Sequence, residues 1–567
     1  MPPRTRTGDS SGTHEVTVGT SRERTFLIAR QEPFVSVGPP PLDLDALHAE
    51  LDADPLVTGL TVLSGAGRAA TVPTPVPLQK IIVARMPEER ALALARRPHV
   101  LIEEDATLHP TVAVFPAMVG PIDPIASLPY GPSVTWQFSV VGGDEAPVTG
   151  AAVLLHGAGI PGQGRTDEAG NVSITLPNES DDTIRALYVN PPGGHWDLWV
   201  DEPTLTSTGR NLVRLEAFGH DVVGTAKQQR LGWGARAMRV HELDPAVTGV
   251  GVKVAVIDSG VHKSHPDLAK ASTGRDFLAN PAKDAGWDDD TTSHGTHCAG
   301  IIAGRPGGGV RGIAPGADVV ALRVLPDGRL SNLLAALDHC IAAEVDVINL
   351  SLVGASLSTL VLGKLAQAKA AGIACVVAAG NTGGPVQFPG ISRDVLTVAA
   401  VGRLGEFPAT SRHARQVPFH IDPFTGWFRA AFSSQGPEVD LCAPGVAVVS
   451  TVGADGYAAW DGTGAAAAHV SGLAALVLAH HPDFSGPLRT RDAARVERLF
   501  MILRASATPL DLGSPGCSGA GVPDALRALH PGIPSVRGGV NAPQTGTPWA
   551  VIEQLRREFI KAGLLIS

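Results

Sequence analysis

A run of small and apolar residues begins at Gly462 and limits the possible folds more than any other segment. The stretch Gly462–Gly472 reads GTGAAAAHVSG, and almost nothing polar follows from Ala465 to His480. A helix without a polar face has to lie inside a large core. The Gly-bearing turn before it, Trp460–Gly464, aims the first N–H groups and the positive end of the helix dipole at whatever lies above. The sequence therefore predicts a buried helix whose N-terminus faces a site.

Apolar segments upstream predict the sheet that would bury this helix. The stretch GVGVKVAVIDSG is a continuous apolar strand, as expected for a parallel sheet covered on both faces, and it ends in Asp258. Four further strands (VVALRVLP, DVINLSL, IACVVAAGN and LTVAAVG) alternate with helical patterns such as Ser331–Glu344 and Thr359–Ala371. The predicted fold class is α/β, with a doubly wound parallel sheet and Asp258 at the carboxyl edge where such sheets place their sites.

Composition limits the partners. The 567 residues are 44% hydrophobic, enough for several domains, and the net charge of −10 gives no basic surface for nucleic acid or an anionic membrane. No uninterrupted apolar run approaches the ~20 residues of a membrane span. The first residues, MPPRTRTGDSSGTHEVTVGT, lack the apolar segment of ~7 to 15 residues that a secretory signal needs. We expect no nucleic acid, no membrane and a cytoplasmic protein, or a secreted one if the true start lies upstream.

The cysteines are odd in number and show no ligand-like spacing, which predicts neither a disulfide framework nor a zinc site. Most are expected to be small core residues. They are Cys298, Cys340, Cys375, Cys442 and Cys517.

Three regions precede the sheet. Residues 1–25 are predicted to be a disordered tail, and residues 26–115 an α+β domain, in which Lys80–Met86 is a strand, PEERALALARR a helix and HVLIEED a strand, half of a ferredoxin-like unit. Residues 116–222 contain short strand-like runs between turns (VTWQFSVV, AAVLLHGAG, NVSITLP, TIRALYVN and WDLWV), the spacing of a small β-sandwich.

Several motifs resemble those of the subtilisin family of serine proteases, the subtilases. They are VAVIDSGV around Asp258, SHGTHCAG around His294 in the proteinase K-like form HGTHCAG, and the stretch at Gly462, where the family reads GTSMAxPHVxG. On that pattern Gly462, Thr463, Ala466, His469, Val470 and Gly472 match, the nucleophilic Ser falls on Gly464, and the family's Met and Pro fall on Ala465 and Ala468. The resemblance extends through residues 223–530.

The resemblance implies a role for each matching residue. Asp258 would orient the base His294, Gly464 stands at the nucleophile position, and Asn381 with the N–H of residue 464 would stabilise an oxyanion. An extended peptide substrate or ligand would bind by strand addition at the edge near Leu325–Ser331 and at a second set of residues. This set is Ser351, Leu352, Val353, Gly354, Ala379 and Gly380. Pro326–Leu330 lacks part of the family's Gly-rich pattern, which leaves the specificity open.

The other regions also resemble known modules. Residues 26–115 look like the subtilase propeptide, an intramolecular chaperone and inhibitor, although an unrelated α+β domain has the same pattern. Thr166–Ile174, TDEAGNVSI, resembles a turn of the carboxypeptidase-regulatory and transthyretin-like sandwiches, in which Asp, Gly and Asn close a hairpin. Trp196 and Trp199 would be either a ligand platform or packing residues. Residues 531–567 are expected to form a linker and a helix that packs or docks.

No cofactor and no metal site is expected. Asp288–Asp290 would be either a calcium site or a solvated acidic loop, and GRPGGGVRG lacks the Asn-rich string of the family's calcium loop. Cys298 would either make the site sensitive to thiol reagents or be an inert buried residue.

Two functions remain open. Intact Asp258, His294 and Asn381 favour a serine endopeptidase that lost its nucleophile naturally or by design, and is inactive as written because Gly has no side-chain oxygen. Ala465 and Ala468 favour a peptide-binding pseudoprotease.

Overall fold

The computed structural model describes residues 23–31, 42–64, 80–112, 132–219, 222–223, 230–279, 281–305, 309–418 and 421–530. These residues fall into two compact units, and the boundary between the units follows Asp105. The predicted C-terminal linker and helix, residues 531–567, lie outside the described residues, as do residues 1–22 of the predicted tail.

The first unit is an antiparallel sheet with two helices. The strands are ordered β2-β3-β1-β4, and the buried side chains of sheet and helices form one core. Its elements are β1 (Glu23–Arg30), α1 (Leu44–Asp52), β2 (Gly59–Ser64), β3 (Lys80–Pro87), α2 (Glu88–Ala95) and β4 (Val100–Glu104). The strand, helix and strand predicted around Pro87 correspond to β3, α2 and β4. The predicted tail, 1–25, was too long, because β1 begins at Glu23 and pairs from there with β3.

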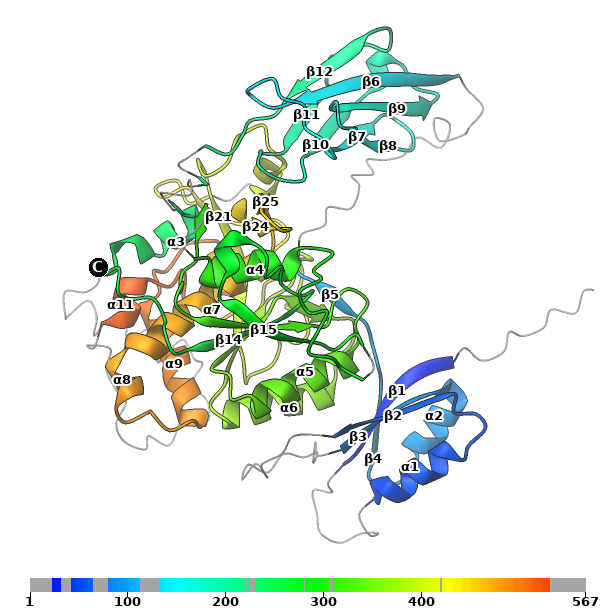
Figure 1. Cartoon of the computed structure of the whole chain (residues 1–567), viewed down its shortest axis with the longest axis vertical. Coiled ribbons are helices and arrows are strands. Elements are labelled where there is room, and N and C mark those ends of the chain that lie inside the picture. The colour runs from blue at the N-terminus through cyan, green and yellow to red at the C-terminus, as the bar shows by residue number, and fades with distance from the viewer. Residues whose placement is uncertain are drawn as a thin grey trace, which may run out of the picture. The chain divides into compact units, whose positions relative to one another are not determined.

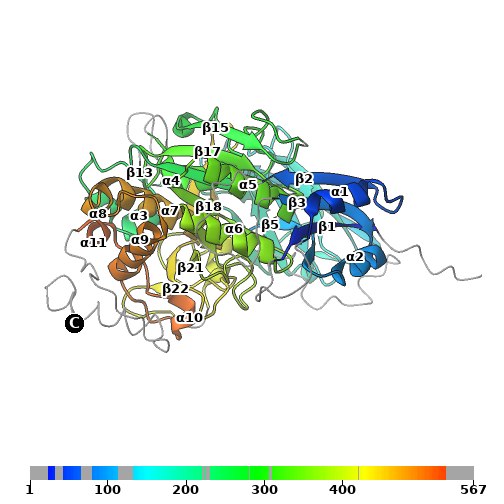
Figure 2. The same ribbon diagram turned by 90° about the horizontal axis from the view of Figure 1, so that it is seen from below.

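The second unit is built on an eight-stranded sheet. The strand order is β15-β17-β14-β18-β20-β21-β22, with β23 beside β21, and neighbours are parallel except β21 and β22. In Figure 2 the labelled strands β15, β17, β18, β21 and β22 follow one another in this order. The bounds are β14 (Lys253–Asp258), β15 (Ala271–Asp276), β17 (Asp318–Arg323), β18 (Val347–Leu350), β20 (Ala374–Ala378), β21 (Leu396–Arg403), β22 (Trp427–Arg429) and β23 (Leu441–Pro444). The predicted α/β class with a mostly parallel sheet is confirmed.

Helices cover this sheet. In Figure 1, α5 (Leu330–Ala342) and α6 (Thr359–Ala370) lie side by side, and α4 (His294–Ala303) packs on α7 (Thr463–His480). Among the described residues α7 is the one helix long and apolar enough to cross a membrane, but 89% of it is buried in the fold, as predicted for a core helix. The remaining helices are α3 (Trp233–Ala237), α8 (Pro482–Ser485), α9 (Ala493–Ser506), α10 (Pro515–Ser518) and α11 (Ala525–Leu529).

Residues 133–214 of the second unit form two smaller sheets, which we call the two-sheet region. The sheets are ordered β11-β10-β7-β8 and β12-β6-β9, and their inner side chains share one core. The strands are β6 (Ser133–Val141), β7 (Ala152–His156), β8 (Gly162–Arg165), β9 (Asn171–Pro177), β10 (Ala186–Asn190), β11 (Leu198–Asp201) and β12 (Arg210–Arg214). The turn at Asp167–Asn171 is closed as predicted, by the Asn171 N–H donating to the Asp167 carboxylate at 2.8 Å, but it joins strands of different sheets and is not a hairpin.

Three short strand pairs complete the described fold. Of these, β24 (Val448–Val452) and β25 (Gly456–Trp460) form the hairpin that leads into α7. The others are β13 (Arg230–Leu231) with β16 (Val310–Arg311), and β5 (Leu108–Pro110) with β19 (Leu352–Gly354). All five cysteines are free and buried, which confirms their predicted place in the core.

Candidate active site

Asp258 ends the central strand β14, and its side chain is fully buried. The strand forms because its residues after Lys253 are apolar and pair on both sides with parallel neighbours. One carboxylate oxygen of Asp258 accepts the N–H of Ser259 at 2.7 Å and lies 2.6 Å from Nδ1 of His294. The parallel sheet thus places a fixed carboxylate at the Nδ1 edge of the imidazole.

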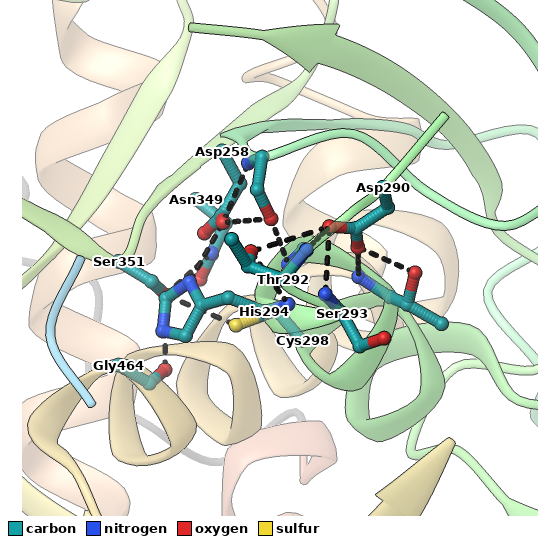
Figure 3. Close-up of polar contacts among 12 residues, drawn as sticks. Asp258, Asp290, Thr292, Ser293, His294, Cys298, Asn349, Ser351 and Gly464 are labelled. Carbon is teal, nitrogen blue, oxygen red and sulfur yellow. Dashed lines mark hydrogen bonds and ion pairs between the residues drawn. The ribbon is translucent and has the colours of Figure 1, made fainter. Parts of the chain in front are cut away.

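His294 is the first residue of α4 and is held by the loop before it. The carboxylate of Asp290 accepts the N–H groups of Ser293 and Thr296 at 2.8 and 2.9 Å, which caps the helix start. Burial by itself lowers the pKa of His294, but the charge of Asp258 and its hydrogen bond outweigh burial and raise this pKa above its ordinary value. The ring points from Asp258 toward Gly464 (Figure 3). This is the geometry of a general base held by a carboxylate.

Two neighbours of His294 on α4 do not titrate near neutral pH. Burial holds the pKa of His297 at about 3, so its ring, which stacks on Trp460 at 4.7 Å between centroids, is neutral. Burial raises the pKa of the Cys298 thiol well above its usual range, which favours the inert alternative for this residue. Asp258, His294 and Cys298 are the one cluster of potential metal-ligand atoms among the described residues, and the hydrogen bond between Asp258 and His294 accounts for its compactness.

Asn381 secures the start of α7. Its side-chain oxygen accepts the N–H of Thr463 at 3.0 Å and the hydroxyl of the same residue at 2.8 Å. The Thr463 hydroxyl in turn accepts the N–H of Gly380 at 3.1 Å. The side-chain nitrogen of Asn381 is buried and has no hydrogen-bond partner among the described residues. An amide held by its oxygen, with its donor free, is suited to stabilise negative charge in front of Gly464.

Ser351 lies beneath the same helix start. Its hydroxyl donates to the carbonyl oxygen of Gly464 at 3.0 Å and accepts from the side-chain amide of Asn349 at 2.8 Å. The thiol of Cys298 lies 3.4 Å from the Ser351 hydroxyl (Figure 3). Ser351 therefore ties β18 and α4 to the turn that carries Gly464.

A segment of the chain itself runs between two backbone edges at this site. On one side β5 pairs antiparallel with β19, and the N–H of Thr111 donates to the carbonyl oxygen of Ser351 at 3.0 Å. On the other side the N–H of Leu108 donates to Gly328, and the N–H of Leu330 donates to Ala106, at 2.8 and 3.0 Å. Residues 106–111 thus make backbone hydrogen bonds on both sides, to β19 and Ser351 on one side and to Gly328 and Leu330 on the other.

This segment ends at the residue position where the nucleophile is expected. The N–H of Gly464 points at the carbonyl oxygen of Thr111 across 3.4 Å. A Cβ atom on Gly464 would lie 2.6 Å from the Thr111 hydroxyl and 2.9 Å from the Ser351 Cβ, and one on Gly462 would lie 2.2 Å from the Thr111 carbonyl oxygen. Because residues 462 and 464 have no side chains, Thr111 can lie against both of them.

The structure brings most of the predicted site residues together. Asp258, His294, Gly464, Asn381 and Gly380 meet at the start of α7, and Ser351 with Leu352–Gly354 forms one edge of the peptide arrangement. Ala379 precedes Gly380 in the chain, and its backbone N–H donates to the carbonyl oxygen of Val398 in the sheet. No sequence pattern predicts a role for Thr111, because its position depends on strand pairing with a distant part of the chain.

The acidic loop before His294 is used within the protein. Asp290 caps α4, Asp288 pairs with Lys263, and Asp289 lies 3.7 Å from the guanidinium of Arg323. These three carboxylates have separate partners and do not converge on one point. Asp290, moreover, is 1% exposed and is not part of a solvated loop.

A mostly parallel α/β sheet with a buried Asp–His pair aimed at a helix N-terminus, and an amide donor beside it, is typical of one class of serine peptidases. Residues 249–511 match the model of the Subtilase family. The chain belongs to this family of subtilisin-like serine proteases.

Individual relatives cover the same region. Subtilisin of Bacillus pumilus is 36% identical over 250 residues, 42% of this chain and 80% of the relative. The thermostable alkaline protease of Halalkalibacterium halodurans (strain ATCC BAA-125 / DSM 18197 / FERM 7344 / JCM 9153 / C-125) is 34% identical over 308 residues, 53% of this chain and 74% of the relative. Subtilisin E of Bacillus subtilis (strain 168) is 37% identical over 250 residues, 42% of this chain, and the chain spans only 58% of its length.

Proposed function

We propose that the chain is a subtilisin-type serine endopeptidase in architecture and is inactive as written, because residue 464 carries no hydroxyl. The observation that carries the proposal is the buried Asp258–His294 pair, whose ring points toward Gly464. In an active form the hydroxyl at 464 would lose its proton to His294 while it attacks a peptide carbonyl, and the N–H of residue 464 and the Asn381 amide would receive the oxyanion.

The substrate class follows from backbone geometry. Residues 106–111 are held by backbone N–H and carbonyl groups of Gly328, Leu330 and β19, which are contacts that any extended polypeptide can make. An unfolded or locally extended polypeptide is therefore the proposed substrate.

We further propose that the first unit acts as an inhibitory propeptide-type domain, and that residues 106–111, which follow it directly in the chain, act as a tethered strand in the site of the second unit. This rests on the strand–helix–strand pattern of the unit and on the Thr111 carbonyl in front of the Gly464 N–H. A tethered strand competes at a high effective concentration, so it excludes free peptides.

The test is Gly464→Ser in the full chain. We expect covalent labelling by a fluorophosphonate and, by intact-mass analysis, a cut after Thr111, while the Gly464 protein stays uncut. Rates should be low, because Ala465 and Ala468 replace the family's Met and Pro and because a displacement of ~1 Å can reduce a rate ~100-fold. The double variant Gly464→Ser/His294→Ala is the control and should neither label nor cleave itself.

A peptide-binding pseudoprotease is the second candidate. It is favoured by Gly464, which makes room for the side chain of Thr111 where a Cβ atom would collide with it. If folded Gly464→Ser neither labels nor cuts itself or an unfolded casein, this second function replaces the first.

A further inference from the structure

The two-sheet region contacts one short segment, residues 410–415, of the part of the second unit that carries the eight-stranded sheet, which we call the protease-like fold. The N–H of Trp199 donates to the carbonyl oxygen of Thr410 at 2.8 Å. Just beyond, the guanidinium of Arg412 lies 5.1 Å from the ring centre of Tyr188, and that of Arg415 lies 4.4 Å from that of Trp199. Arg415 also pairs with Asp201. The tryptophan at 199 is therefore a contact between the two parts rather than a free ligand platform.

His413 lies at the centre of this contact and is 1% exposed. Its Nδ1 is 2.7 Å from a carboxylate oxygen of Asp461, and its Nε2 is 3.8 Å from one of Asp197. The rings of Trp196 and Phe407 lie beside it at 6.0 and 6.2 Å between centroids. The imidazole thus sits between a carboxylate of the two-sheet region and a carboxylate of the protease-like fold.

Asp461 connects this contact to the helix start. The carboxylate oxygen that meets His413 also accepts the N–H of Ala447 at 2.7 Å, and the carboxylate is buried. The next residue, Gly462, donates its N–H to the carbonyl oxygen of Gly445 at 2.8 Å and begins the turn into α7. The position of Asp461 therefore fixes the turn that presents residue 464.

We propose that His413 and Asp197 are positioning residues, through which the two-sheet region holds the turn Asp461–Gly464 in place. The two-sheet region would then help to hold the site in its shape, rather than only separate other parts of the chain. This inference does not depend on a nucleophile at 464 and so does not rest on the proposed function.

The charges around His413 support a protonated ring. Burial by itself lowers the pKa of His413, but Asp461 and then Asp197 outweigh it and raise this pKa above its ordinary value, against an opposing effect of Arg412. Burial likewise raises the pKa of Asp461, and the charge of His413 outweighs burial and lowers it. The second carboxylate oxygen of Asp197 accepts the hydroxyl of Tyr188 at 3.2 Å. Both carboxylates thus favour the protonated form of the ring.

Loss of this proton weakens the contact. When the pH rises through the pKa of His413, the ring loses the positive charge that attracts Asp197 across 3.8 Å, while Nδ1 can still donate to Asp461. Asp197 keeps the N–H of Arg412 and the hydroxyl of Tyr188, so the contact weakens at His413 alone. We therefore expect the turn to open more often above that pKa.

The experiment is hydrogen exchange of the full chain between pH 5.5 and 9, followed in peptides that cover residues 445–464 and corrected for intrinsic exchange. Protection should fall with rising pH in the unaltered protein. Asp197→Asn should move the midpoint of this fall down by about one pH unit, the usual effect of removing a nearby opposite charge. Asp201→Asn is the matched control, because it removes the partner of Arg415 in the same contact but does not touch His413.

Equal shifts in the two Asp→Asn variants, or none in Asp197→Asn, would overturn the proposal. In His413→Gln the transition should vanish, and its persistence would contradict us. If Asp197→Asn does not fold, NMR titration of the His413 ring decides: a pKa at or below the ordinary value of 6.5 overturns the proposal, and one above it supports it.

Discussion

At the scale of single residues, Asn381 does two separable things. Its side-chain oxygen holds the first residue of α7, and its nitrogen is left as a free donor. The fold needs the oxygen, whereas stabilisation of an oxyanion needs the nitrogen.

Substitutions can separate these two uses. Asn381→Ala should lower the free energy of unfolding by about 1 kcal/mol, the typical loss for a helix cap, whereas Asn381→Asp keeps an acceptor at the helix N-terminus and should lose less. In the Gly464→Ser background both should reduce fluorophosphonate labelling about 100-fold or more, the effect known for such a donor in subtilisin. Denaturant unfolding and labelling rates measure the two effects. If Asn381→Asp labels like its parent, the donor role is wrong.

The Asp258–His294 pair predicts a pH-dependent stability. Because the pKa of His294 is raised in the folded state above its ordinary 6.5, the pair stabilises the fold fully below that value and progressively less as the pH rises through the folded pKa. Asp258→Asn should therefore cost more stability at pH 6 than at pH 9. Urea unfolding of both proteins at the two pH values checks this. A cost that is equal, or larger at pH 9, would contradict the raised pKa.

At the scale of elements, the strand β5 depends on one anchor. Leu108 is 2% exposed, and its neighbours His109 and Pro110 are exposed. Burying a carboxylate at this position is unfavourable, so Leu108→Asp should release residues 106–111 from the edges that hold them. Hydrogen exchange in peptides that span this segment should rise at least tenfold. Leu357→Asp, at a leucine that is 61% exposed, is the control. Unchanged exchange in Leu108→Asp would show that the segment is retained without this side chain, by its backbone contacts and by the buried Ala106 and Thr111.

Sequence patterns predicted those elements whose own residues form an apolar run or a recognisable motif. The continuous apolar strand before Asp258 predicted β14 and placed Asp258 at the carboxyl edge of the sheet, and the resemblance of the motif around His294 to the subtilases predicted that the two residues meet. The strand β8, GQGR, was missed because it has no apolar residue. Its glycines lie where a Cβ would come within 2.7 Å of side chains of β9, so the strand is set by close packing that no pattern reveals.

The same limit applies to the site. Thr111 and His413 acquire their positions from residues far away in the chain, the first by strand pairing and the second by contact with Asp197 and Asp461. No pattern in the flanking residues predicts the position of either residue. Motifs identify the catalytic residues that a family shares, whereas contacts between distant regions of one chain become known only from the three-dimensional structure.

At the scale of the whole molecule, the β5 segment has a kinetic consequence. An added peptide cannot pair with β19 until the protein's own strand leaves, so association should proceed through a rare open state. The observed rate should rise with peptide concentration and then level off at the rate of opening, which is the same for every peptide sequence. Stopped-flow fluorescence with a labelled ATLHPT peptide and with a scrambled one measures this plateau. A rate that climbs linearly without limit would mean that the site is open already. At high peptide concentration, the rate of peptide binding would then be a property of this protein alone, independent of the abundance and sequence of the peptides around it.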